Sequence, residues 1–131
     1  MGCVLREVVI DCADPKRVAT FWSAVLGWPL TEETTGLCWI SSTGEPWAPA
    51  PVLVFVPVPE PKTLKNRVHI DVNPSGADQA EELDRLLALG ASRVDIGQGD
   101  VPWVVLADIE GNEFCLLARR VDPPAGSDAS A

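Results

Sequence analysis

The stretch DPKRVATFWSAVLGW, residues 14–28, decides the fold of the first half of the chain. Asp14 can accept hydrogen bonds from the amides of a first helical turn, and Pro15 lacks the amide hydrogen that would be unpaired there. Five apolar residues then recur on one face at helical spacing: Val18, Phe21, Trp22, Val25 and Leu26. Gly27 predicts the end of the helix, because glycine readily adopts a left-handed C-cap.

Strands are predicted on both sides of this helix. Residues 3–12 precede it and are rich in β-branched side chains, and three short apolar segments follow at residues 28–32, 37–41 and 52–58. The prolines of residues 41–51 indicate a loop between the last two. The first half therefore has the predicted order βαβββ.

The second half repeats this order. Its predicted helix covers residues 77–89, with Ala80, Leu83, Leu86 and Leu87 inward and Gly90 at its end. The predicted strands cover residues 67–72, 92–96, 101–107 and 113–118. Three dipeptides of the first half have counterparts in the second: Ile10-Asp11 and Ile70-Asp71, Leu26-Gly27 and Leu89-Gly90, Trp39-Ile40 and Trp103-Val104.

These patterns predict an α+β fold in which two βαβββ modules, residues 3–60 and 65–119, form one curved composite sheet with the helices outside. Neither half is large enough to bury both faces of its own sheet, so we expect a single domain over residues 1–120. Residues 121–131 carry little that could be buried, and they are predicted to be a disordered tail.

Composition excludes several classes of function. The 131 residues are 47% hydrophobic, which is ample for one core, and their net charge of −9 disfavours nucleic acid and anionic membranes as partners. The apolar run at residues 52–58 is far shorter than the roughly 20 residues of a membrane helix. The N-terminus lacks the pattern of a signal peptide, so we expect a cytoplasmic protein. Its four cysteines form no CxxC pair, and we expect them to be reduced and buried.

The βαβββ pair, with Phe21-Trp22 before Leu26-Gly27-Trp28, resembles the vicinal oxygen chelate superfamily of glyoxalases, bleomycin resistance proteins and extradiol dioxygenases over residues 3–118. Two stretches, KNRVHID at residues 65–71 and GNEFC at residues 111–115, are more specifically similar to actinobacterial glyoxalase-like domain proteins. Ile109 departs from the pattern, because the family usually has proline at that point of the turn.

The resemblance implies a cavity in which many members hold a divalent metal with histidine and carboxylate ligands from the first and last strands of each module. It places His69 at one ligand position, and Cys115 where the family has a carboxylate, with Glu113 two residues earlier. Counting back from Asp14 puts Glu7 at the first-module position. Aligning Ile10-Asp11 with Ile70-Asp71 instead puts Val9 there.

The fourth position falls on Val54 or Val56, neither of which can ligate a metal. Glu7, His69 and Cys115 are a poor set for Mg²⁺ or Mn²⁺ and suit Zn²⁺ better. The resemblance therefore implies an eroded metal site, with either no cofactor or a divalent metal, zinc before magnesium or manganese.

Polar and aromatic residues suggest what such a cavity would do. Glu7, Asp11, His69 and Asp71 could form a polar wall capable of proton transfer, or could simply accept hydrogen bonds from the backbone. Trp39 and Trp103 fall on equivalent strands, and Trp47 lies in the loop that could cover the cavity. Indoles in an acidic field suit a flat apolar ligand, including a cationic one, although plain packing is the alternative.

Two hypotheses follow. The first is a protein that binds a small hydrophobic or aromatic molecule through Trp39, Trp47, Trp103, Asp11 and Val56, as bleomycin-binding members of the superfamily do. The second is a lyase or isomerase of the glyoxalase type, with or without a metal, in which His69 acts with Glu7 or Asp71. The resemblance also implies a homodimer.

Overall fold

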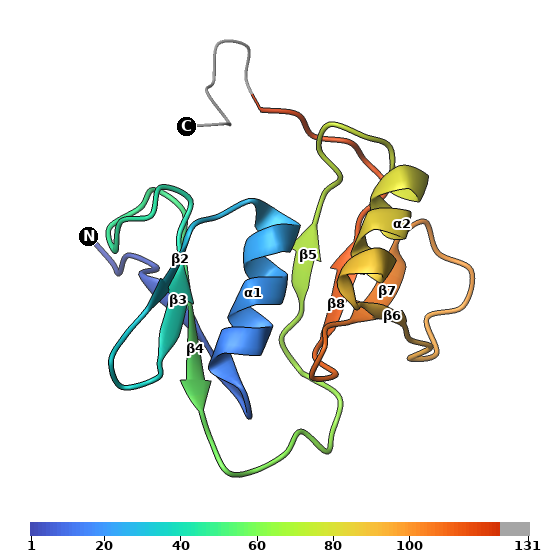
Figure 1. The fold of residues 1–131 in the computed structure, drawn as a ribbon. Helices are drawn as coiled ribbons and strands as arrows, with labels where there is room; N and C mark the ends of the chain where they lie inside the picture. The colour runs from blue at the N-terminus through green and yellow to red at the C-terminus, as the bar shows by residue number, and fades with distance from the viewer. Residues whose placement is uncertain (124–131) are drawn as a thin grey trace. The chain divides into compact units, whose positions relative to one another are not determined.

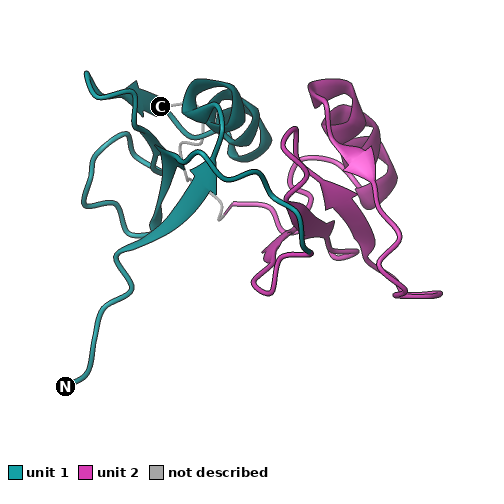
Figure 2. Cartoon of the chain, turned by 90° about the horizontal axis from the view of Figure 1, so that it is seen from below, with its two compact units in different colours: residues 1–64 teal, residues 65–131 magenta. Residues whose placement is uncertain are grey.

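The structure is a computed structural model that describes residues 1–123, and its elements follow the predicted order βαβββ twice (Figure 1). The first set is β1 (Glu7–Cys12), α1 (Pro15–Leu26), β2 (Leu30–Glu32), β3 (Cys38–Ile40) and β4 (Val52–Pro57). The second set is β5 (Ile70–Val72), α2 (Gln79–Leu89), β6 (Ser92–Arg93), β7 (Val104–Ala107) and β8 (Glu113–Leu116). The chain divides into two compact units, residues 1–64 and residues from 65 onward (Figure 2).

Each unit has its own four-stranded mixed sheet with the same topology. The strand order is β1-β4-β3-β2 in the first unit and β5-β8-β7-β6 in the second. The first strand of each unit pairs in parallel with the last, and the remaining pairs are antiparallel. The α+β class and the two βαβββ modules are thereby confirmed. The composite sheet concerns the placement of the two units and stays a prediction.

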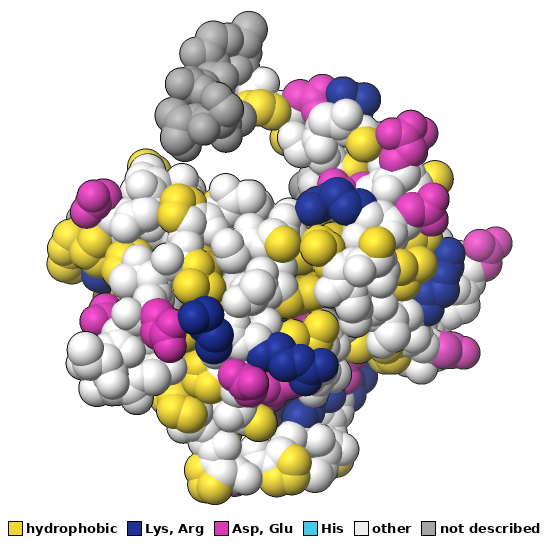
Figure 3. Space-filling view, in the orientation of Figure 1, with side chains coloured by type: hydrophobic (Ala, Val, Ile, Leu, Met, Phe, Trp, Pro, Cys, Tyr) yellow, Lys and Arg dark blue, Asp and Glu magenta, His cyan; other side chains and the backbone are white. Residues whose placement is uncertain are grey.

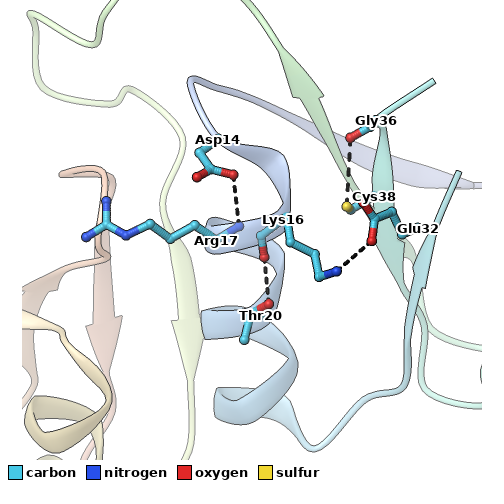
Figure 4. A network of polar contacts seen from close by, with 7 residues as sticks. All are labelled: Asp14, Lys16, Arg17, Thr20, Glu32, Gly36 and Cys38. Atoms are coloured by element: carbon cyan, nitrogen blue, oxygen red, sulfur yellow. Dashed lines mark hydrogen bonds and ion pairs between the residues drawn. The ribbon is translucent and has the colours of Figure 1, made fainter. Parts of the chain in front are cut away.

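Helix α1 begins and ends as its sequence indicates. The side chain of Asp14 accepts from the amide of Arg17 at 3.2 Å, and Gly27 takes the left-handed C-cap conformation with φ of 68°. Lys16 forms an ion pair with Glu32 of β2 at 2.6 Å (Figure 4). The helix packs on β2, β3 and β4, and its buried residues are Pro15, Val18, Ala19, Phe21 and Trp22. This apolar face is the core of the first unit.

Helix α2 begins at Gln79, later than predicted, because the side chain of Asp78 caps it by accepting from the amide of Glu81 at 2.9 Å. Leu83 and Leu86 are buried. The prediction that Ala80 faces inward is wrong, because Ala80 is exposed in the first turn, ahead of the buried stripe.

The strands of the second unit are shorter than predicted. Strand β5 starts at Ile70, which pairs with Phe114 near the start of β8, so that His69 lies just before the strand. Strand β7 starts at Val104, and Trp103 lies outside it. Periodicity extended both strands because it detects alternation but not where a partner strand ends.

The predicted burial of the cysteines differs from the structure at one position. Cys3 is exposed, whereas Cys12, Cys38 and Cys115 are buried; the four cysteines, all within residues 1–123, form no disulfide.

The C-terminal boundary of the domain also differs from its prediction. Val121 donates to the carbonyl of Pro74, and Asp122 accepts from the amide of Gly76, both at 2.8 Å, so the chain stays attached beyond residue 120. Most of the predicted tail, residues 124–131, lies outside the described residues. Within residues 1–123, no helix is both long and apolar enough to cross a bilayer.

Candidate functional site

One face of the first sheet carries most of the site residues predicted for that half. Cys38 and Phe55 are register partners, and both are fully buried on the side of the sheet that α1 covers. Burial raises the pKa of the Cys38 thiol, and the charge of Glu32 raises it further. The opposite face carries residues of the other parity, namely Glu7, Val9, Asp11, Trp39, Val54 and Val56. We call this surface the Trp39 face.

The Trp39 face is an apolar strip between carboxylates. Val9 is 52% exposed and is the register partner of the buried Val54, which also pairs with Trp39. Glu7 and Asp11, two residues to either side of Val9, are exposed. The indole nitrogen of Trp39 donates to Oε1 of Glu33 at 2.9 Å, which fixes the half-buried ring.

The other two predicted indoles lie in different settings. Trp47 is 79% exposed, and the guanidinium of Arg6 lies 3.5 Å from its ring centroid while also donating to the carbonyl of Pro46. One face of this ring therefore already has a cation. Trp103, in the second unit, is 40% exposed.

In the second sheet, Asp71 and Cys115 are register partners in the parallel pair β5 and β8. Asp71 is exposed, whereas Cys115 and Glu113, which share its face by alternation, are buried. Burial raises the pKa of the Cys115 thiol, and the neighbouring charge of Asp71 raises it further. We call this surface the Asp71 face.

His69 lies half-buried at the start of the Asp71 face, with one ring nitrogen closely surrounded. Its Nε2 lies 2.9 Å from Nζ of Lys65 and 2.9 Å from the carbonyl oxygen of Asn66. Nζ of Lys65 also donates to that carbonyl at 3.3 Å. The lysine ammonium and the imidazole therefore share one backbone acceptor.

Asn66 is held by hydrogen bonds to the hairpin turn that precedes β8 and to the first residue of that strand. Its backbone amide donates to Oε2 of the buried Glu113 at 3.0 Å, and its side-chain amide donates to Oδ1 of Asn112 at 3.2 Å. Asn112 is itself held by Asp108, whose carboxylate accepts from its backbone amide at 3.0 Å and from its side-chain amide. These contacts connect the two stretches that carry the family resemblance.

Sequence reasoning missed Lys65, Asn66 and Asn112 as site residues. All three lie in the two quoted stretches, so their concentration of polar residues beside a histidine was the available signal. The contact itself joins positions 46 residues apart, which no local spacing reveals.

The donors of the second unit do not fit a divalent cation as they are arranged. Nε2 of His69 faces an ammonium group, and the Glu113 carboxylate accepts from the Asn66 amide. Residues 1–123 contain no group of three or more His, Cys, Asp or Glu side chains that could hold a metal. The set Glu7, His69 and Cys115 draws on both units, and it stays a prediction.

The sequence of residues 7–117 matches the family model of the glyoxalase-like domain. The chain belongs to the glyoxalase-like domain family. No curated protein matches this glyoxalase-like chain. The expected membership of the vicinal oxygen chelate superfamily is thereby confirmed at the level of the glyoxalase-like domain.

Solved structures show the same fold at low identity. The fosfomycin resistance protein FosX from Mesorhizobium loti is 14% identical with a TM-score of 0.66, covering 89% of this chain and 92% of that one. A FosX mutant from Listeria monocytogenes, complexed with Mn(II) and a dihydroxypropylphosphonic acid, is 14% identical with a TM-score of 0.64, covering 90% and 91%. A glyoxalase/bleomycin resistance protein/dioxygenase family enzyme from Burkholderia phytofirmans is 20% identical with a TM-score of 0.58, covering 87% and 97%.

Proposed function

We propose that this glyoxalase-like protein binds a small apolar or aromatic molecule, including a cationic one, on the Trp39 face and without metal chemistry. The observation that carries the proposal is the position of Trp39. Its indole is tied to Glu33 beside the partly exposed Val9, between the exposed carboxylates of Glu7 and Asp11. A ring of this kind offers an apolar surface whose electron-rich face attracts cations.

Charge favours the same class of ligand. A cation over an indole contributes about 0.5–2 kcal/mol, depending on how far it is desolvated. The net charge of −9 also raises the local concentration of cations. On the face drawn in Figure 3, acidic side chains lie in several small groups, some of them beside basic ones, between larger uncharged areas. The Listeria FosX complex, in which a protein of this fold holds a small organic molecule, supports a small-molecule ligand.

Calorimetric titration tests the proposal with pairs of ligands. Each pair consists of an aromatic quaternary ammonium compound and its neutral isostere. Trp39→Phe should weaken the binding of both ligands of a pair by about 1 kcal/mol, because the smaller ring keeps only part of the aromatic contact. Asp11→Asn should weaken the binding of the cationic ligand only. Trp28→Phe is the matched control, because Trp28 follows α1 and lies outside the Trp39 face.

Two results would count against this function: binding that is unchanged in Trp39→Phe, or no binding by any pair at millimolar concentration. Thermal unfolding of each variant shows whether lost binding reflects a lost fold. Sedimentation of the same samples tests the expected homodimer, and fractionation of producing cells tests the expected cytoplasmic location.

A second candidate is a lyase or isomerase centred on His69. The observation that favours it is the contact of Nε2 with Lys65 and Asn66, which fixes the only imidazole of the chain at the start of the Asp71 face. Metal analysis followed by Zn²⁺ titration separates the candidates. Stoichiometric zinc that is lost in His69→Ala favours the enzyme, whereas zinc binding that is absent or unaffected by this change favours the metal-free binding protein.

A further inference from the structure

We propose that the ring of Trp47 and the carbonyl of Pro46 form a guanidinium-binding site, which Arg6 of the same chain fills. The guanidinium carbon of Arg6 lies over the indole, 3.5 Å from the ring centroid, and Nη1 donates to the Pro46 carbonyl. A guanidinium is planar and has N–H donors along its edge, so it can lie against an aromatic ring and donate to a carbonyl at the same time. The two groups together recognise both properties.

Arg6 connects the loop of residues 41–51 to the start of β1. Its own backbone is fixed there, because its carbonyl accepts from the amide of Val52 at 3.2 Å. The other hydrogen bonds of the loop join residues that both lie within 41–45. Within residues 1–123, Arg6 therefore provides the one hydrogen bond that joins this loop to another part of the chain. The contact acts as a latch on the loop.

The latch is held by the ring and the carbonyl rather than by a pair of charges. Although the chain has 19 acidic residues, Arg6 forms no ion pair with a carboxylate of residues 1–123. Trp47 is 79% exposed, so packing in a core does not hold its ring in place. When Arg6 is replaced, the ring and the carbonyl remain and are open to another guanidinium group.

Arg6 keeps a free ligand out because it is part of the chain. A group held by a short tether competes at an effective concentration on the order of millimolar. A small molecule with a guanidinium group must exceed that concentration to displace Arg6, and its binding would release the loop. The wild-type site is therefore closed by an internal copy of its ligand. This inference does not rest on the proposed function, because Trp39 takes no part in it.

The indole N–H resonances in ¹H–¹⁵N spectra test the inference, since each of the five tryptophans gives one. Trp47→Phe identifies the resonance of Trp47. In Arg6→Ala, ethylguanidinium should shift this resonance saturably, whereas ethylurea, a neutral compound of similar shape, should not. The wild-type protein should need about tenfold more ethylguanidinium for the same shift.

Arg17→Ala is the matched control, because Arg17 uses its backbone amide, and not its guanidinium, in the contact with Asp14. It should respond as the wild-type protein does. Arg6→Met is a second variant that keeps an unbranched side chain at this position, and the other indole resonances show whether each variant is folded.

Three results would overturn the inference. The first is a Trp47 resonance that ethylguanidinium leaves unchanged in both folded Arg6 variants. The second is an equal response to ethylurea, and the third is a wild-type protein that responds at the same concentration as the variants. The Trp39 resonance in the same spectra reports binding on the Trp39 face, so the two proposals can fail separately.

Discussion

Asp71 and Cys115 are register partners in the parallel pair of β5 and β8, which places a carboxylate beside a thiol on the Asp71 face. Burial is the largest cause of the raised pKa of Cys115, and the charge and hydrogen bond of Asp71 add to it. A charged thiolate would be both poorly solvated and repelled there. The thiol is therefore held in its neutral, unreactive form.

Alkylation should reveal this difference between cysteines. At neutral pH, iodoacetamide should modify the exposed Cys3 much faster than Cys115, as peptide mass spectrometry would show. Asp71→Asn should lower the pKa of Cys115 and speed its modification at alkaline pH. Equal rates at the two cysteines, or no effect of Asp71→Asn, would contradict this account.

The same pKa gives a pH dependence of stability. Because the pKa of Cys115 is raised in the folded state, this thiol contributes fully to the free energy of unfolding below the ordinary thiol pKa. The contribution is lost as the pH rises from that value through the raised one. Urea unfolding should therefore show stability falling at alkaline pH, and Cys115→Ser should reduce this fall. A fall of the same size in the variant would assign it to other groups.

The hydroxyl of Ser41 should be dispensable. Ser41 is fully buried, and its Oγ is the buried side-chain polar atom without a hydrogen-bond partner within residues 1–123. Ser41→Ala removes an unsatisfied group and should raise the free energy of unfolding by about 1 kcal/mol. In the matched variant Ser23→Ala, a hydrogen bond of 2.6 Å to the carbonyl of Trp28 is lost, so stability should fall by about 1 kcal/mol. Chemical denaturation of both variants measures the contrast, and a destabilised Ser41→Ala would contradict it.

The two helix-ending glycines should differ in their tolerance of alanine. Gly27 and Gly90 both have positive φ, but a Cβ at Gly27 meets nothing within 4 Å, whereas one at Gly90 would lie 3.0 Å from Cγ2 of Ile109. Gly27→Ala should therefore cost about 1 kcal/mol, the strain of a left-handed residue. Gly90→Ala should cost more, and thermal unfolding of the pair, together with Gly90→Ala in an Ile109→Ala background, tests whether Ile109 is the cause.

Asp122 should make the attachment of residues 121–122 sensitive to acid. Its pKa is lowered by the hydrogen bond from Arg120 and by the amide of Gly76. With a lowered folded-state pKa, the contribution is present above the ordinary carboxyl pKa and is lost as the pH falls through the lowered value. The protection of the Gly76 amide against hydrogen exchange, relative to its intrinsic exchange rate at each pH, should fall in that range. Asp122→Asn should make its protection weaker and independent of pH there.

Sequence alone determined the order of the elements and which residues share a face. The Asp14 and Gly27 caps and the helical spacing between them are local properties, so α1 has its predicted ends. Strand alternation likewise placed Glu7 and Asp11 on one face, because successive side chains of a strand point to opposite sides. Only the register of β3, β4 and β1 in the structure placed Trp39 on the same face.

Only the tertiary structure decided where the strands stop and what surrounds His69. Strand β5 starts at Ile70, which pairs with Phe114 near the start of its partner β8. The Asn66 anchor comes from Asn112 and Glu113, which are far away in sequence. Such contacts depend on how the chain returns to the same point in space. The family resemblance identified His69 as a candidate. Periodicity and spacing describe only near neighbours along the chain, so they could not identify the residues that hold it.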